Sequence, residues 1–477
     1  MEFETVIGLE VHAQLATSTK MFCNCSIEFG QDPNLNTCPV CLGLPGALPT
    51  INETAVKYAI MLGLATHCSI RKDSQFARKN YFYPDLPKAY QTSQFDRPIC
   101  ENGWVEIEVE GKKKKIGITR IHMEEDAGKL VHDGGDRTAS YVDLNRAGTP
   151  LVEIVSEPDI RNSAEAKAYM EKIHSIVTYL DICNGNMEKG NLRCDANVSI
   201  RPFNQSEFGI RTETKNLNSF RNVQDAIEFE IERQIELTFE GDPIIQQTRL
   251  WDANQKTSKA MRSKEDSDDY RYFPCPDLPI VLVDDSLIQQ LKAQLPELPD
   301  VKQLRFQSQY ALGEKDASNL VANKKIAEYF EETVENGAEA KQTANWILSD
   351  FSRLLNENKV EIDECKIKPN ALASLIQLIA DGVISSKIAK TVFEEMFASG
   401  NAPDKIVKEK GLTQVSNEDE IKSICQKILD ENPSQIDEFK AGKVKVLGFF
   451  VGQVMKQTKG KANPQLVNKL LNDLLSC

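Results

Sequence analysis

The chain has 477 residues, of which 41% are hydrophobic and 27% charged, and a formal net charge of −14. This length predicts more than one domain, and the negative charge argues against a basic surface for indiscriminate nucleic-acid binding. No apolar run reaches about 18 residues and no targeting segment opens the chain, so we expect a cytoplasmic protein without a membrane span. Twelve cysteines in such a chain predict reduced thiols rather than a disulfide framework.

Residues 1–293 read as a domain rich in strands. The first strand is expected at 3–12, and alternation of β-branched residues predicts further strands at 103–109, 115–123, 151–155 and 196–200. Two helices interrupt them, with Ser163 and Asn222 as predicted N-caps, and the lysines at 112–115 are predicted to form a hairpin tip. Because strands and helices alternate irregularly, we predict an α+β fold with a mixed sheet rather than a doubly wound one.

Helical periodicity dominates the remainder of the chain. Residues 294–402 predict an all-α domain, which includes a helix capped by Ser386 and ended by Gly400. Pro403 marks a second predicted boundary, followed by a small helical tail domain at 403–477. Between Lys440 and Lys469 there are seven lysines and no acidic residue. This run is either a solvated face or a local nucleic-acid-binding surface.

Four cysteines form two close pairs, Cys23-x-Cys25 and Cys38-Pro-x-Cys41. Four thiolates suit a tetrahedral, closed zinc site, which would be structural because no coordination position stays open. Sulfur ligands also admit an iron–sulfur cluster, although no neighbouring feature suggests redox chemistry. The alternative is four reduced thiols in a buried loop.

Acidic residues recur at the predicted strand ends, together with one histidine: Glu10, His12, Glu124, Glu125, Asp195 and Glu213. Residues two apart on a strand share a face, so Glu10 and His12 are expected to point the same way. Convergence of these strand ends would create an oxygen-rich site suited to Mg²⁺. Surface salt bridges are the alternative. The chain has no phosphate-binding P-loop, no dinucleotide fingerprint and no nucleophile elbow.

Taken together, these stretches resemble the GatB/GatE family, whose members are components of aminoacyl-tRNA amidotransferases. The resemblance runs along essentially the whole chain in order. It is carried by Phe3-Glu4-Thr5-Val6-Ile7-Gly8-Leu9-Glu10-Val11-His12, Asn80-Tyr81-Phe82-Tyr83-Pro84-Asp85, Ile121-His122-Met123-Glu124-Glu125-Asp126, Asp143-Leu144-Asn145-Arg146, Leu192-Arg193-Cys194-Asp195-Ala196-Asn197, Lys215-Asn216-Leu217-Asn218-Ser219-Phe220, Asp268-Asp269-Tyr270-Arg271-Tyr272-Phe273-Pro274 and Ala462-Asn463-Pro464-Gln465-Leu466-Val467.

The resemblance implies a cradle domain, a helical domain and a YqeY-like tail. It also implies a glutamine-hydrolysing ligase that works with the GatA amidase and GatC subunits. ATP phosphorylates the side-chain carboxylate of Glu-tRNA(Gln) or Asp-tRNA(Asn), and ammonia then displaces phosphate to give Gln-tRNA(Gln) or Asn-tRNA(Asn). Mg²⁺ is the expected cofactor, since phosphoryl transfer depends on positioning and charge neutralisation. Zinc is expected at the four cysteines as a structural metal.

The family's functional residues transfer to matching positions of this sequence. The implied magnesium ligands are Glu10, His12, Glu125, Asp195 and Glu213. Glu124 matches the residue at the exit of an ammonia channel, Lys79 is an expected phosphate or carboxylate contact, and the implied tRNA-binding residues are Lys456, Lys459 and Lys461. A GatE-type relative would be longer and carry an inserted domain. A non-catalytic tRNA scaffold is a further alternative, although its clustered acids would repel phosphates unless a metal intervened.

Overall fold

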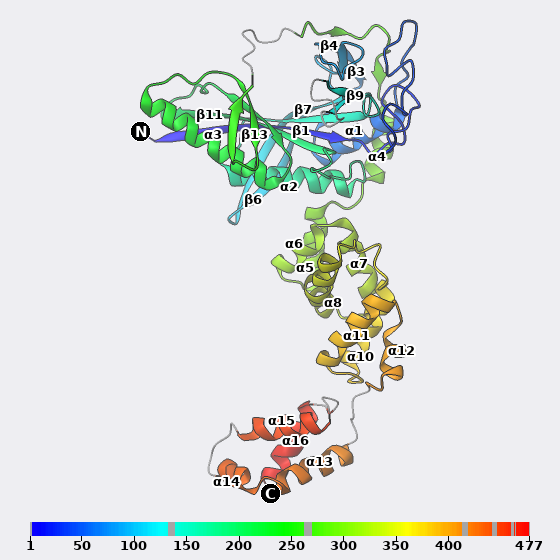
Figure 1. Ribbon diagram of the computed structural model, residues 1–477, viewed down its shortest axis with the longest axis vertical. Coiled ribbons are helices and arrows are strands. Elements are labelled where there is room, and N and C mark those ends of the chain that lie inside the picture. The colour runs from blue at the N-terminus through cyan, green and yellow to red at the C-terminus, as the bar shows by residue number, and fades with distance from the viewer. Residues whose placement is uncertain are drawn as a thin grey trace. The chain divides into compact units, whose positions relative to one another are not determined.

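The computed structural model describes residues 2–131, 139–261, 270–412, 418–440, 446–458, 462 and 464–476. The chain divides into two compact units, Met1–Leu298 and Pro299–Cys477 (Figure 1). The last helix of the first unit, α4 (Asp285–Gln294), runs across the predicted boundary at 293/294. The division into a cradle, a helical domain and a tail stays a prediction.

A nine-stranded sheet forms the centre of the first unit. Its strands, in spatial order, are β14 (Thr257–Ala260), β13 (Thr248–Asp252), β12 (Thr212–Leu217), β11 (Leu192–Pro202), β1 (Phe3–Gln14), β10 (Pro150–Ser156), β7 (Lys112–Glu125), β6 (Cys100–Val109) and β2 (Ser69–Ile70). All neighbours pair antiparallel except β12 and β13, which are parallel. The predicted mixed sheet and α+β class are confirmed.

Smaller sheets accompany the large one. A three-stranded sheet has the order β15 (Phe273–Pro274), β4 (Ala77–Asn80) and β5 (Tyr90–Ser93). Two pairs complete the set, β16 (Val281–Leu282) with β3 (Asp73–Ser74), and β8 (Lys129–Val131) with β9 (Tyr141–Asp143). The three-stranded sheet is important for the site because β4 carries Lys79.

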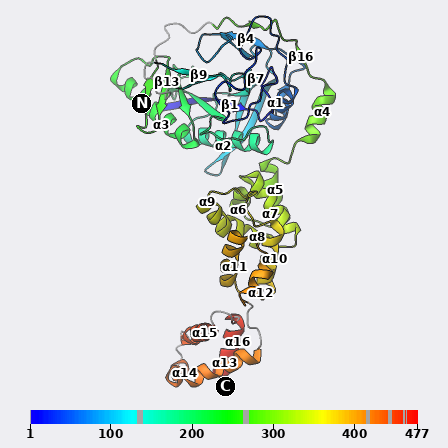
Figure 2. The same ribbon diagram turned by 45° about the vertical axis from the view of Figure 1, so that its right-hand side comes forward.

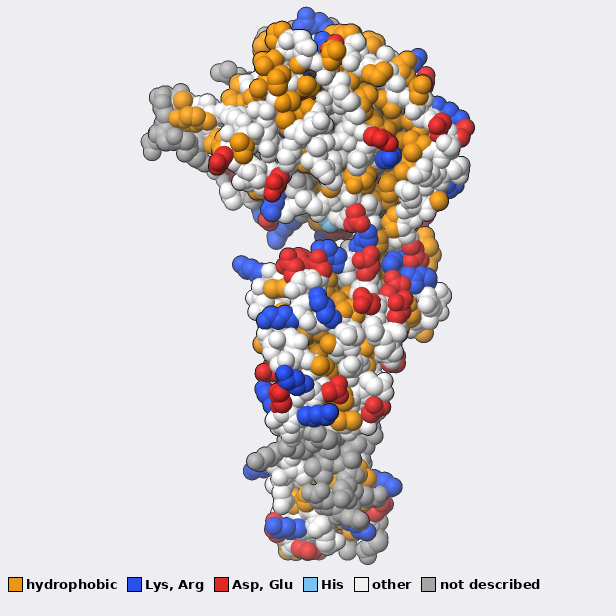
Figure 3. All heavy atoms as spheres, turned by 90° about the vertical axis from the view of Figure 1, so that its right-hand side faces the viewer, with side chains coloured by type: hydrophobic (Ala, Val, Ile, Leu, Met, Phe, Trp, Pro, Cys, Tyr) orange, Lys and Arg blue, Asp and Glu red, His pale blue; other side chains and the backbone are white. Residues whose placement is uncertain are grey.

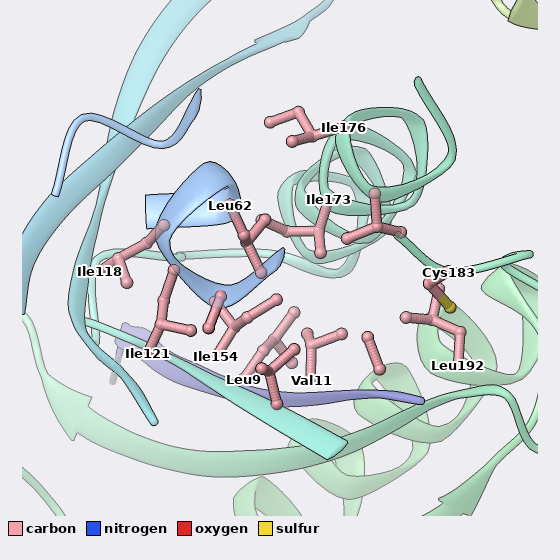
Figure 4. Close-up of a cluster of buried hydrophobic side chains, with 14 of the residues drawn as sticks. Leu9, Val11, Leu62, Ile118, Ile121, Ile154, Ile173, Ile176, Cys183 and Leu192 are labelled. Carbon is pink, nitrogen blue, oxygen red and sulfur yellow. The ribbon is translucent and has the colours of Figure 1, made fainter. Parts of the chain in front are cut away.

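Helices α1 (Glu53–Ala65), α2 (Ser163–Tyr179) and α3 (Phe220–Glu240) contribute to the core of this unit, together with Leu291 of α4. Figures 1 and 2 show α2 and α3 along the same side of the sheet. Leu9 and Val11 of β1 face Leu62 of α1 and Ile173 of α2 in a buried cluster (Figure 4). Each such side chain contributes roughly 1.5–3 kcal/mol through its burial. Alternation along β1 leaves its even-numbered side chains on the opposite face of the sheet.

The helix starts show where local sequence reasoning falls short. The caps of α2, α3 and α11 (Ser386–Ser399) are Asn162, Ser219 and Ser385, whose side chains accept hydrogen bonds from backbone N–H groups three residues on. The predicted caps Ser163, Asn222 and Ser386 lie inside these helices. The lysines at 112–115 belong to strand β7, and the hairpin turn is Glu110–Gly111, both with positive φ.

A buried ionic network joins α3 to the sheet. Glu230 is fully buried and accepts two hydrogen bonds from Arg233, at 2.8 and 2.6 Å, and others from Thr212 and Gln234. The Arg249 guanidinium lies 3.6 Å away. Burial raises the pKa of Glu230, but these donors outweigh it and hold the pKa below its ordinary value.

Replacing Glu230 by glutamine is therefore expected to destabilise the first unit by about 3 kcal/mol near neutral pH, since two arginines lose their buried counter-charge. The lowered pKa gives the sign of the pH dependence: the stabilisation is complete above pH 4.5 and is lost as the pH falls through the folded-state pKa. Denaturant unfolding at several pH values measures this, with Glu232→Gln, an exposed position of the same helix, as control. An equal loss of unfolding free energy at every pH would contradict this prediction.

The second unit consists of helices only, among the residues that the structure describes. They are α5 (Pro299–Tyr310), α6 (Glu314–Val321), α7 (Lys324–Glu335), α8 (Ala340–Trp346), the π-helical turn η1 (Ile347–Phe351), α9 (Ser352–Asn358), α10 (Pro369–Ala380), α11, α12 (Pro403–Glu409), α13 (Glu418–Asp430), α14 (Pro433–Lys440), α15 (Val446–Gln457) and α16 (Pro464–Ser476). In the described part of the chain, no helix combines the length and apolar character needed to cross a bilayer. Acidic and basic side chains are interspersed over the helical face in Figure 3, whereas hydrophobic ones gather on the first unit.

Two separate hydrophobic clusters stabilise this second unit. One extends from Phe306 to Val407 and the other from Ile421 to Leu475. The predicted tail domain begins at residue 403, but Ile406 and Val407 of α12 are buried in the first of these clusters. Helix α12 therefore packs with the helices before it.

Candidate functional site

The face of the sheet opposite the helices carries a band of polar side chains. Strand alternation places Glu10 and His12 of β1 on this face, because Leu9 and Val11 fill the core. Antiparallel register then sets Glu153 of β10 opposite both His12 and His122, so that three polar residues lie side by side across three strands.

The first cluster consists of His12, Glu124 and Glu153, whose ligand atoms lie within 4.8 Å of one another. His12 Nε2 is 3.4 Å from Glu153 Oε2 and 3.9 Å from Glu124 Oε1. His122 Nε2 reaches the same Glu153 oxygen at 3.2 Å. The donor set is two carboxylates with an imidazole, which fits a hard divalent cation.

The electrostatics of this cluster favour a bound positive charge. Burial lowers the pKa of His12, but Glu153, Glu124 and Asp195 together raise it to about 9. Burial raises the pKa of Glu153, and the two imidazoles overcome it and hold the pKa well below its ordinary value. Burial and the neighbouring Glu153 raise the pKa of Glu124.

The second cluster consists of Glu10, Asp195 and Glu213, again with ligand atoms within 4.8 Å. Asp195 of β11 lies opposite Glu10, and Asn197 donates to Glu10 Oε1 at 3.0 Å. Burial, then Glu153 and Glu213, raise the pKa of Glu10, which shows that the charges of the two clusters interact. This all-oxygen set also fits Mg²⁺.

Lys79 lies near the first cluster, on β4. Its ammonium is 4.7 Å from the ring centre of Tyr270 and 5.7 Å from that of Tyr81. Burial lowers the pKa of Lys79, but Tyr272 and Glu124 lead a set of neighbours that raise it above its ordinary value. A cation so placed is available to an anionic substrate group.

The structure separates the two adjacent glutamates at the end of β7. Glu124 joins the first cluster, while Glu125 points to the opposite face, where Lys88 pairs with it and the Thr92 N–H donates to it at 2.8 Å. The reason is strand parity, because successive side chains alternate faces. Neither acidic cluster found among the described residues includes Glu125, so its place in the ligand set stays a prediction.

Glu125 lines a cavity of about 320 Å³. Its wall also includes Lys20, Cys41, Lys88 and Tyr90. The cavity thus lies between the Lys88–Glu125 pair and the cysteine loop.

The four cysteines Cys23, Cys25, Cys38 and Cys41 come together with their sulfurs within 4.8 Å. The thiol of Cys23 hydrogen-bonds Cys41, and with the Cys38 N–H and the charge of Lys20 it lowers the pKa of Cys41 to about 5. Lys20 is buried, and its ammonium donates to Asn36 O at 2.7 Å and lies 3.6 Å from Cys41 Sγ. This geometry can hold one metal ion, and four sulfurs fit zinc.

The predicted tRNA-binding residues are described only in part. Lys456 is exposed in the last turn of α15. Lys459 and Lys461 lie outside the described residues.

Sequence reasoning missed several residues of the polar band, chiefly Glu153, His122 and Arg193. Arg193 lies opposite His12 and pairs with buried Asp126 at 2.9 Å. A signal for Glu153 was present, since it is an acid inside the apolar run Leu151–Val155. His122 and Arg193 also had a local signal, since each lies two residues from a predicted ligand on the same strand, Glu124 or Asp195. Strand pairing then brings them beside His12 and Glu153.

Comparison with known proteins identifies the family of the chain. A model of the GatB/GatE catalytic domain matches residues 5–289, and a GatB domain model matches residues 328–475. Among similar proteins, the B subunit of the aspartyl/glutamyl-tRNA(Asn/Gln) amidotransferase from Desulfotalea psychrophila is 56% identical over 476 residues, which is 100% of both chains. The protein of the same name from Geobacter sulfurreducens is 57% identical over 473 residues, 99% of each chain. The chain belongs to the family of B subunits of the aspartyl/glutamyl-tRNA(Asn/Gln) amidotransferases.

Proposed function

We propose that this chain converts Glu-tRNA(Gln), Asp-tRNA(Asn) or both into the amidated forms by phosphorylating the side-chain carboxylate and exchanging phosphate for ammonia. The observation that carries the proposal is the pair of carboxylate-rich clusters on one sheet face, one of which contains an imidazole. A free carboxylate resists attack because it is anionic and lacks a good leaving group. Transfer of the terminal phosphoryl group of ATP creates an acyl phosphate, from which phosphate leaves as the C–N bond forms.

His12, Glu124 and Glu153, together with Glu10, Asp195 and Glu213, are the residues that would hold Mg²⁺. The bound ion would neutralise phosphate charge and orient the nucleotide. The protein's own part is to keep six ligand groups close together on a rigid sheet. Asn197 fixes Glu10, and the two imidazoles fix Glu153.

Lys79 and Glu125 take the remaining roles. We assign to Lys79 a contact with the phosphate or the substrate carboxylate, supported by its nearness to Glu124 and Glu153. The resemblance gives Glu124 an ammonia-side role, whereas we propose Glu125 for that role. Strand parity favours Glu125 for it, because Glu125 faces the cavity on the other side of the sheet. There it can accept the extra proton of ammonium, leaving neutral NH₃ as the nucleophile.

The name of the relatives implies an enzyme of several different chains. We propose that a GatA-type amidase supplies the ammonia from glutamine and that a GatC-type protein completes a heterotrimer. The described residues of the chain provide no nucleophile elbow for glutamine hydrolysis. We place the reaction in the cytoplasm, where aminoacyl-tRNA is used.

We expect Lys456→Glu combined with Lys459→Glu to weaken tRNA binding. Phosphate contacts release counterions, so each lost contact should reduce the slope of log affinity against log salt by about one. Filter binding at several salt concentrations measures this, with Lys387→Glu, an exposed lysine of α11, as matched control. Unchanged affinity and slope in the double variant would mean that these lysines only form a solvated face and do not bind tRNA.

ATP turnover by the purified heterotrimeric complex tests the proposed function. Hydrolysis should depend on Mg²⁺ and on Glu-tRNA(Gln) or Asp-tRNA(Asn), and the amidated tRNA should appear in step with phosphate. A non-catalytic scaffold would bind tRNA without stimulating ATP turnover. The GatE alternative is disfavoured because the amidotransferase relatives align over their full length without an inserted domain.

A further inference from the structure

The second cluster already contains a cation from the chain itself. The ammonium of Lys215 lies 2.7 Å from Asp195 Oδ2 and 2.7 Å from Glu213 Oε1. Both are charge-assisted hydrogen bonds, the stronger kind in proteins. The Lys215 side chain is still 39% exposed, compared with 15% for Asp195 and 25% for Glu213. The lysine therefore covers the acids from the solvent side and has room to leave.

An irregularity in the pairing of β11 and β12 directs the Lys215 side chain toward the acids. Pairing between β11 and β12 passes from Ala196↔Thr214 to Cys194↔Leu217, so Lys215 and Asn216 together oppose the single residue Asp195. Such a β-bulge re-aims a side chain and is common beside active sites. Asn216 adopts φ 70°, which asparagine tolerates better than most residues, and its side chain donates to Trp251 O at 3.1 Å.

The other contacts of the acids remain when the lysine is removed. Asn197 donates to Glu10 at 3.0 Å, and Thr248 Oγ1 donates to Glu213 Oε2 at 2.7 Å. These neutral donors orient two of the three carboxylates but leave their charge uncompensated. Lys215 is the cation in direct contact with two of the acids, and it uses oxygens that a metal ion would need.

We propose that Lys215 is a built-in counter-ion that a divalent cation must displace from the second cluster, and that the displaced ammonium then binds the phosphates of the nucleotide. The inference rests on the proposed function, since it assumes that the cluster binds a cation together with ATP. The consequence is that cation binding and nucleotide binding are coupled. The cation releases Lys215 from the acids, and the released ammonium then becomes a partner for the triphosphate. Lys215 is thus a positioning residue whose loss has opposite effects on the two ligands.

Two binding measurements on the full chain test this. Lys215→Met should bind Mn²⁺ at the second cluster about tenfold more tightly than the unmodified chain, measured by electron paramagnetic resonance of free Mn²⁺. The same variant should bind β,γ-methylene-ATP about tenfold more weakly in saturating Mg²⁺, measured by calorimetry. Lys215→Arg should restore nucleotide affinity more than cation affinity. Lys114→Met, which removes a lysine paired at 2.7 Å with Glu165, should change neither.

The outcomes separate this inference from the function on which it rests. A purely structural lysine predicts weaker Mn²⁺ binding in Lys215→Met, because the acids would spread apart, and that result overturns the inference. Unchanged binding of both ligands overturns it as well. If the unmodified chain binds Mn²⁺ at two sites and Glu10→Gln loses one of them, the second cluster is a metal site whatever the role of Lys215. If the unmodified chain binds no Mn²⁺ at all, the proposed function itself fails.

Discussion

Replacing Glu124 by glutamine is expected to remove most divalent-cation binding at the first cluster and to lower amidation on the order of 100-fold or more. The side chain supplies one of two carboxylates around His12, and its oxygen lies 3.9 Å from the imidazole. Glutamine keeps the size but not the charge. Amidation of Glu-tRNA by the complex and Mn²⁺ binding by the chain measure the two effects.

The neighbouring glutamate provides an internal comparison. Glu125→Gln should also lower amidation, because Lys88 loses its partner at the cavity, but it should leave Mn²⁺ binding unchanged. Glutaminase activity of the proposed amidase partner should survive in part in both variants. The assignment is refuted if Glu125→Gln loses the cation and Glu124→Gln retains it, or if Glu125→Gln amidates at the full rate.

Replacing Cys41 by serine is expected to reduce bound zinc from about one ion per chain to almost none. Cys41 is the most buried ligand, and three neighbours stabilise its thiolate. The loop from Lys20 to Pro49 should then become sensitive to protease, because small metal sites derive much of their folding free energy from the ion. Metal analysis after gel filtration and limited proteolysis measure the two effects.

Amidation should fall less in the Cys41 variant than in the Glu124 variant. The acidic clusters are anchored by strand pairing, which does not involve the cysteine loop. Cys365→Ser, a buried cysteine of the second unit, is the control and should leave the zinc content unchanged. Full zinc retention in Cys41→Ser would mean that three of the sulfurs suffice or that the metal binds elsewhere.

Much of the fold was predictable because each element carries its own pattern. The alternation of β1 matches the buried face seen in the structure, and so does the apolar stripe of α2 and its C-cap (Tyr169, Ile173, Ile176, Val177 and Leu180). Helix caps were predicted less well, since serine and asparagine neighbours compete for the same role and the local backbone decides. The order of the nine strands has no local signal and depends on long-range pairing.

The site was predictable as a list of residue types rather than as a geometry. Spacing two apart on β1 correctly places Glu10 and His12 on one face. Adjacent acids at a strand end do not by themselves indicate which one joins the cluster. The parity of β7, whose Ile121 and Met123 lie in the core, places Glu124 there. Glu153 shows the other limit, because its partners belong to strands that lie far away in sequence.

The three hydrophobic clusters, at 7–291, 306–407 and 421–475, share no buried residue. Heating should therefore produce overlapping calorimetric transitions, and a single melting temperature would not describe the chain. A substitution such as Glu230→Gln would shift only the transition of its own cluster. Ligands should also act on single clusters. A nucleotide should raise the transition temperature of the first cluster, and tRNA bound by the tail should raise the transition temperature of the third.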